Sequence, residues 1–184
     1  MKKFLTLILL FCPILVFAQD LVTFKLTPQA TFVTASGEDF VVVPFDGKSA
    51  HEIYQTLASN VGSVYNAPSK VMNVVEDASI KIRAFSPSFF KQKIIGVPIE
   101  FGLYYQLEFR IKDGRVRVSA PYFEDDNEVG DIGNFAKIVK KWFKNGQVKE
   151  KETKTVAGLE LYINGIINSI LGLTGRTSNI DDDW

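Results

Sequence analysis

The sequence predicts an α+β fold built around an antiparallel sheet, and three features support this prediction. Apolar side chains occupy every odd position from Ile99 to Ile111, which is the period of a strand with one buried face. The Asp113-Gly114 pair that follows is typical of a type I′ hairpin turn, because both residues tolerate a positive φ. Later segments carry apolar residues at helical spacing, so helices accompany the sheet.

The turn fixes a register for the hairpin that it closes, in which the return strand begins at Arg115. Apolar residues of the two strands then face one another in four pairs: Ile111 with Val116, Phe109 with Val118, Leu107 with Ala120 and Tyr105 with Tyr122. Because the two apolar faces coincide, the pattern and the turn predict the same hairpin from Ile99 to Phe123.

Upstream of the hairpin, local patterns predict strands and one helix. Phe40 to Phe45 is a short, continuous apolar run, and Pro44 places it near a sheet edge or a strand end. Ser49 and Glu52 have the spacing of a capping box, which begins a helix that ends near Asn66. Two further strands are predicted, at Val71 to Val75 and at Ile80 to Phe85. An irregular connection at Ser86 to Pro98 is expected to lead from the second of these strands into the hairpin.

Two helices are expected after the hairpin, over residues 134–145 and 156–172. Asp131 suits the N-cap of the first helix. The second helix carries its apolar residues on one face, and we expect that face to pack on the domain's own sheet. Binding to a membrane surface would need Lys or Arg on the opposite face, which instead carries Glu160, Asn164 and Asn168.

The first residues have the features of a secretory signal peptide. Lys2 and Lys3 precede an apolar run that ends at Phe17, and Ala18 supplies the small residue at the cleavage position. The run is shorter than the roughly 20 residues of a membrane-spanning helix, and it contains Pro13. We therefore expect export to the periplasm or the medium, with cleavage after Ala18 and no transmembrane helix in the mature chain.

Cleavage would also remove Cys12, the single cysteine of the sequence. The mature chain is then expected to have neither a disulfide nor a thiol nucleophile. Lipidation of Cys12 is the less favoured alternative, because Phe11 precedes it where lipoproteins have a small residue. After residues 1–18, we expect an extended segment at 19–38, one α+β domain at 39–172 and a disordered tail at 173–184.

Composition and motifs exclude several classes of function. The 21 basic and 21 acidic residues give a formal charge of zero, so nucleic acid is not an expected partner. His51 is the single histidine, and it lies in the first turn of a helix, where an exposed polar residue is ordinary. The sequence has no nucleophile elbow, zinc-protease motif or phosphate-binding glycine loop. We therefore expect no catalytic, cofactor-binding or metal-binding residues.

The acidic stretch after the hairpin partly resembles a calcium-binding loop. Asp125, Asn127 and Gly130 stand at positions one, three and six of such a loop. Val129 at position five and Ala136 at position twelve lack the oxygen ligands that those positions supply. A solvated acidic loop before a helix is the favoured interpretation, and weak binding of a divalent ion is the alternative.

Three short motifs stand together between residues 39 and 123. Gly47-Lys48-Ser49 opens a helix that carries Glu52-Ile53-Tyr54, and Lys112-Asp113-Gly114-Arg115 forms the hairpin tip. With the order of elements, these motifs resemble a family of uncharacterised exported bacterial proteins, a domain of unknown function with a TATA-box-binding-protein-like fold. The resemblance implies a curved antiparallel sheet of about five strands, in β-α-β-β-β-β-α order, with helices on one face. It implies no activity, because the family has none assigned.

Two surfaces are candidate binding sites. One is the connection at 86–98, where clustered apolar residues either cover the core or form a partner patch: Phe89, Phe90, Ile94 and Ile95. The other is the outward face of the sheet, a candidate anionic-ligand surface that carries Lys81, Arg83, Arg110 and Arg117. In the predicted register Arg110 lies opposite Arg117, and Glu108 is placed to compensate this repulsion. A solvated face that limits aggregation is the favoured interpretation of the second surface.

These observations favour an exported, non-enzymatic binding or assembly module of the bacterial cell envelope. Its partner is expected to be an unidentified protein or envelope component. Catalysis by side chains generally needs a titratable group tuned by its neighbours, and the sequence shows none. The alternative is an envelope hydrolase that uses paired carboxylates. It would require Glu100, Glu108 or the acidic loop to share a cleft with a basic residue.

Overall fold

The structure is a computed structural model that describes residues 21–94, 97–124 and 134–173, without the side chains of residues 88–101. Its centre is a six-stranded antiparallel sheet in the order β3-β7-β6-β5-β4, with β8 paired to β6. The strands are β3 (Phe40–Pro44), β4 (Met72–Val75), β5 (Ser79–Ile94), β6 (Val97–Lys112), β7 (Arg115–Ser119) and β8 (Tyr122–Phe123). The α+β class is confirmed, and the sheet is larger than the five strands predicted.

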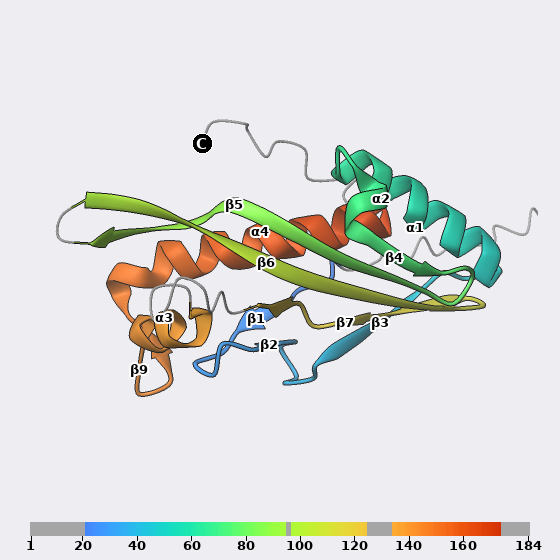
Figure 1. Cartoon of the computed structure of the whole chain (residues 1–184). Helices are drawn as coiled ribbons and strands as arrows, with labels where there is room; N and C mark the ends of the chain where they lie inside the picture. The colour runs from blue at the N-terminus through green and yellow to red at the C-terminus, as the bar shows by residue number, and fades with distance from the viewer. Residues whose placement is uncertain (1–20, 95–96, 125–133, 174–184) are drawn as a thin grey trace, which may run out of the picture.

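Helices cover one face of this sheet. The helical elements are α1 (Ala50–Val64), α2 (Pro68–Val71), α3 (Phe135–Trp142), the 3-10 turn η2 (Glu150–Glu152) and α4 (Thr153–Leu171). Both α1 and α4 contact β5, α1 also contacts β6 and α4, and Figure 1 shows α4 running lengthwise along the β5–β6 hairpin. The buried apolar side chains of this layer include Ile53, Ile80, Phe109 and Ile163. None of the helices in the described ranges has the length and hydropathy needed to cross a bilayer.

Next to its turn, the β6–β7 hairpin has the predicted register. The confirmed pairs are Phe109 with Val118, Arg110 with Arg117 and Ile111 with Val116. The alternation along β6 therefore identified the buried face correctly, since Phe109 is fully buried and Arg110 is exposed.

The register moves by one residue where β7 ends at Ser119. In β8, Phe123 and not Tyr122 is the partner of Tyr105. Pro121 lies at this break, and proline has no backbone N–H with which to continue a strand ladder. Two predicted pairs are therefore wrong: Leu107 with Ala120 and Tyr105 with Tyr122.

The turn between β6 and β7 also differs from the prediction. Gly114 has a φ of 72°, but Asp113 is not among the residues with positive φ, so the type I′ assignment is wrong. The Asp113 carboxylate accepts a hydrogen bond of 2.7 Å from the backbone N–H of Ala50. The N–H of Gly114 donates to the carbonyl of Lys48 at 2.8 Å. Contacts with the start of α1 thus fix this turn, and local composition does not reveal them.

The helices α1 and α3 begin at side-chain caps. Ser49 and Glu52 form the predicted capping box at α1, because each side chain accepts a hydrogen bond from the backbone of the other. At α3 the N-cap is Asn134, whose side chain accepts from the N–H of Lys137 at 2.8 Å. Asp131, the predicted cap, lies outside the described residues, as do residues 125–130 of the acidic loop that begins at Glu124.

The prediction of an irregular connection at residues 86–98 is wrong. β5 continues to Ile94 and β6 starts at Val97, so the two strands form one long hairpin. The register shifts between Ser86 and Phe90, which marks a bulge or irregularity in this hairpin. The candidate partner patch of Phe89, Phe90, Ile94 and Ile95 therefore falls on strand backbone or outside the described residues, and it stays a prediction because those side chains are not described.

The N-terminal segment lies against α4 and is held there by side-chain amides. Asn168 accepts a hydrogen bond from the N–H of Val22 and donates one to its carbonyl, both at 2.8 Å. Asn164 makes the same pair of bonds to Phe24, both at 2.9 Å. Each amide thereby bonds the backbone of one residue as a neighbouring strand would.

Glu160 continues this row one helical turn earlier. Its carboxylate accepts from the N–H of Leu26 and from the Nζ of Lys25, both at 2.9 Å. We call Glu160, Asn164 and Asn168 the N-terminal clamp. The segment that it holds contributes the buried side chains of Val22, Phe24 and Leu26, together with Phe32. The N-terminal segment also carries a small hairpin of β1 (Lys25–Leu26) and β2 (Phe32–Val33). A second small hairpin, which follows α3 in the chain, consists of β9 (Phe143–Lys144) and β10 (Gln147–Val148).

A charge on the buried face of β6 should unfold the domain. Phe109 is fully buried, and an unpaired carboxylate there would cost a large share of a net stability of about 5 to 15 kcal/mol. Phe109→Asp should therefore abolish the cooperative thermal transition, whereas Arg110→Gln on the exposed face should keep it. Similar melting temperatures for the two variants would show that the register is wrong.

The clamp should be sensitive to loss of a single amide donor. Asn168→Asp keeps the size of the side chain but leaves the buried carbonyl of Val22 without its donor, which should cost about 1 to 3 kcal/mol in urea unfolding. Asn73→Asp makes the same chemical change at an exposed position of β4 and should be close to neutral. Equal effects of the two substitutions would contradict a structural role for Asn168.

Candidate functional site

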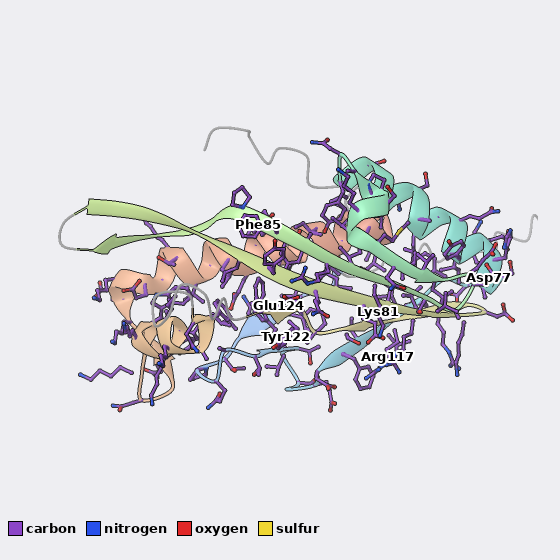
Figure 2. The ribbon with its side chains drawn as sticks, viewed as in Figure 1. Asp77, Lys81, Phe85, Arg117, Tyr122 and Glu124 are labelled. Carbon is purple, nitrogen blue, oxygen red and sulfur yellow. The ribbon has the colours of Figure 1, made fainter. Side chains whose placement is uncertain are left out.

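The sheet face opposite the helices carries exposed or half-buried side chains from several strands, and we call it the outer face. Its residues are Lys81, Arg83 and Phe85 of β5, Tyr104, Gln106, Glu108 and Arg110 of β6, Arg117 and Ser119 of β7, and Tyr122 and Glu124. Figure 2 shows Phe85 apart from Lys81 and Arg117 along the length of the sheet. Phe85 and Tyr122 are 51% and 61% exposed, so this face presents large apolar surfaces to solvent.

One group of side chains on the outer face is organised around Arg83. Its guanidinium donates to both carboxylate oxygens of Glu124, at 2.8 and 2.7 Å, and lies 4.2 Å from the centre of the Tyr104 ring. Gln106 donates a further hydrogen bond of 2.8 Å to Glu124. The Tyr104 ring in turn packs 4.9 Å from the ring of Phe85. We call these five residues the Arg83 cluster.

Charge pairing in this cluster favours the ionised forms of both partners. The hydrogen bonds from Arg83, and then from Gln106, hold the pKa of Glu124 below its ordinary value, although partial burial opposes the shift. The same carboxylate raises the pKa of Arg83. A bidentate pair also fixes the plane of the guanidinium, and with it the stacked ring of Tyr104.

Phe85 reaches this position because Gly102, two residues before its partner Tyr104 on β6, has no side chain. A Cβ built on Gly102 would stand 2.3 Å from the tip of the Phe85 ring and 3.0 Å from the carbonyl of Ser86. The ring therefore covers the Gly102 backbone and packs against Tyr104. A glycine inside a strand often marks such a close approach.

A second group on the outer face surrounds the carboxylate of Glu108. Arg110 and Lys81 lie 3.1 and 3.3 Å from it, and the Ser119 hydroxyl donates to it at 3.3 Å. Partial burial raises the pKa of Glu108, but the hydrogen bonds from Arg110 and Lys81 outweigh it, so the pKa is below its ordinary value. This carboxylate is thus ionised at neutral pH and shared by two cations.

A shallow hollow of about 140 Å³ opens between the two groups. Its polar lining consists of Lys81, Gln106, Glu108, Ser119 and Tyr122, and Leu107 and Ala120 complete it. The hollow borders the break between β7 and β8, where the ladder is interrupted. The interruption near Pro121 therefore lies beside a recess of the outer face on which several polar groups converge.

The predicted anionic-ligand residues all lie on the outer face. Arg110 pairs with Arg117 across β6 and β7, as predicted, and Glu108 compensates on the Arg110 side. Lys81, Arg83 and Arg110 each contact a carboxylate, whereas Arg117 lies 4.2 Å over the ring of Phe40. The face therefore carries mixed charge, and an anionic ligand would compete with Glu108 and Glu124 for these cations.

Sequence reasoning missed the outward position of Tyr122. The predicted register turned this residue toward the buried Tyr105, but a shift of one residue moves every following side chain to the other face. Tyr122 is exposed as a result, and Phe123 is buried instead. Pro121 was the available signal, because proline interrupts a ladder and so permits the shift.

Comparisons with known proteins place few limits on function. No family model and no curated protein matches this chain, so the resemblance to exported bacterial proteins stays a prediction. Among solved structures, the chain is similar to a TBP-like protein from Parabacteroides distasonis ATCC 8503. The TM-score is 0.48 and the identity 10%, over 76% of this chain and 92% of that chain. At that TM-score the likeness is loose, and it says nothing of activity.

The Arg83–Glu124 pair should make stability depend on acid pH. The folded-state pKa of Glu124 is below its ordinary value of 4.5, so the pair stabilises the fold fully above that pH and loses this contribution as the pH falls through the lowered pKa. The melting temperature of Glu124→Gln should therefore lie below that of the wild type at pH 7, and the gap should shrink by pH 3. A gap that stays constant between these pH values would contradict this assignment.

Proposed function

We propose that this protein is an exported, non-enzymatic binding or assembly module of the bacterial cell envelope, and that it binds its partner with the outer face. One observation carries the proposal. Phe85, Tyr104 and Tyr122 are exposed on a sheet face that no described element covers, and contacts within the Arg83 cluster hold Phe85 and Tyr104 in place. The features of a signal peptide at residues 1–18 support export, although those residues lie outside the described structure.

The composition of the outer face supports a protein as the partner. Tyrosine, phenylalanine and arginine are enriched in the centres of protein interfaces, where rings fill pockets of the partner. Phe85, Tyr104 and Arg83 contact one another in a continuous row of this composition, with the two rings tilted by 48° to each other. Because the Glu124 salt bridge and the Gly102 backbone already position these side chains, binding would order few of them further.

The ionised carboxylates of the outer face support a role without general acid catalysis. A catalytic acid at neutral pH needs a raised pKa, and Glu108 and Glu124 both have lowered ones. Each of them is also occupied by cations on the same face. Pairing of this kind orients side chains for contact instead of proton transfer.

An envelope hydrolase is the second candidate, because Glu108 does share the 140 Å³ hollow with Lys81. A carboxylate that shares a cleft with a basic residue is the arrangement that such an enzyme requires. Turnover of a glycan or peptide substrate in a screen, lost in Glu108→Gln and kept in the exposed Glu38→Gln, would favour this candidate over a binding module. No turnover in any of the three proteins is the result that a binding module predicts.

Photo-crosslinking in living cells tests the binding face. A benzophenone amino acid placed at Tyr122 should capture a specific envelope component, whereas the same group at Leu161 should not. Leu161 is a matched control because it is 70% exposed but lies on α4. Phe85→Ser should weaken capture from position 122, because it removes one exposed ring of the Arg83 cluster without opening the core.

Intact cooperative melting of each variant is the control for folding. Capture from position 161 that equals capture from position 122, or capture that Phe85→Ser leaves unchanged, would contradict the assignment of the outer face. Intact-mass measurement of the protein from the envelope tests export separately, and the expected mature chain begins at Gln19.

A further inference from the structure

The single histidine lies beside two carboxylates from a distant part of the chain. His51 is in the first turn of α1, and its Nδ1 is 3.0 and 3.2 Å from the two carboxylate oxygens of Asp77. Asp77 belongs to the turn between β4 and β5, where it has a φ of 57°. Glu76 precedes it in the same turn. One ligand atom from each of His51, Glu76 and Asp77 lies within 4.8 Å of the others.

Hydrogen bonds outside this group hold its two halves together independently of the side chains of His51, Glu76 and Asp77. The carbonyl of Ala78 in the β4–β5 turn accepts from the N–H of Ile111 at 2.8 Å. At the start of α1, the N–H of Ala50 donates to Asp113, two residues after Ile111. Both halves are therefore tied to the β6–β7 turn, so their proximity does not depend on the His51–Asp77 contact.

The second nitrogen of the imidazole also has a partner. The side-chain amide nitrogen of Gln55, one helical turn after His51, lies 2.7 Å from Nε2, so in this rotamer the amide donates to Nε2 and Nδ1 carries the proton toward Asp77. Rotation of the amide by about 180° presents its oxygen to Nε2 instead, and this oxygen then accepts a hydrogen bond from Nε2–H and leaves the Nδ1 lone pair for a metal. Histidines that bind metals almost always have such a hydrogen bond on the other nitrogen, because it fixes the ring and the tautomer.

We propose that His51, Glu76 and Asp77 form a binding site for Zn²⁺ or a chemically similar late first-row divalent ion. Imidazole nitrogen and carboxylate oxygen are both zinc ligands, and three protein ligands leave the fourth position to water. The imidazole selects these ions over Ca²⁺ and Mg²⁺, which prefer oxygen ligands. An ion pair explains the contact between His51 and Asp77, but a metal also gives Glu76 a partner and offsets the repulsion between the two carboxylates.

The geometry requires little movement. Ligand atoms of tetrahedral zinc lie about 2.0 to 2.1 Å from the ion, and so roughly 3.3 Å from one another. The three atoms are within 4.8 Å of each other before any adjustment. His51 and Glu76 are exposed and Asp77 is half-buried, so rotation of side chains at the surface can close the difference.

Nitrogen NMR of the untagged full-length chain gives a direct test, because His51 is its single histidine. Titration with ZnCl₂ at pH 7.5 should shift Nδ1 into the range of a metal-bound nitrogen, with saturation at one ion per chain. Calorimetry should show affinity for Zn²⁺ that is reduced about tenfold or more in Glu76→Gln and lost in His51→Gln. Glu38→Gln, an exposed carboxylate in the turn before β3, should bind like the wild type.

Three results would overturn the proposal. The first is an Nδ1 resonance that stays unchanged at saturating ZnCl₂. The second is a Glu76→Gln variant that binds Zn²⁺ as tightly as the wild type. The third is binding of Ca²⁺ as tight as that of Zn²⁺, with both affinities unchanged in His51→Gln. The last result would indicate carboxylate binding alone. Glu76→Gln carries the test if His51→Gln does not fold, because Glu76 lies on an exposed turn and its replacement should leave metal-free stability unchanged.

Discussion

The hydrogen bonds between α4 and the N-terminal segment complete the core of this protein. Four residues of an α-helix advance about 6 Å, and two residues of a strand advance about 6.6 Å, so side chains at every fourth helical position can bond alternate strand residues. Glu160, Asn164 and Asn168 meet Leu26, Phe24 and Val22 in this way, in antiparallel order. The side chains of that segment are buried as a result, and its backbone polar groups are satisfied where water is excluded.

Closure of the helical layer leaves the two faces of the sheet in different environments. α1, α4 and the N-terminal segment bury the apolar face, whereas the outer face keeps its rings and charges in solvent. The break near Pro121 adds to this asymmetry, since it places Tyr122 outside and Phe123 in the core. Phe123 packs there between Phe32 of the N-terminal segment and Phe135 of α3. The same register break therefore exposes the ring of Tyr122 and places the ring of Phe123 in the core.

The sequence predicts those parts of the fold that depend on local patterns. The alternation of apolar and polar residues predicted the buried face of β6, and the spacing of Ser49 and Glu52 predicted the start of α1. It could not predict contacts between distant residues, such as the bond from Ala50 that sets the conformation of the Asp113 turn. The clamp was missed for the same reason, because polar residues opposite an apolar helix face normally meet water. On the outer face the four cations were predicted, but the Arg83 cluster depends on Glu124, which local patterns assign to an acidic loop.

Amide hydrogen exchange measures most directly whether the N-terminal segment is part of the core. The amides of Val22, Phe24 and Leu26 donate to the clamp, so they should exchange as slowly as the central amides of β6, through global unfolding. The intervening amide of Thr23 should exchange faster, because its residue is exposed. Exchange of Val22, Phe24 and Leu26 at the rates of an unfolded chain, with β6 still protected, would show that the segment is only loosely attached and would contradict a core completed by α4.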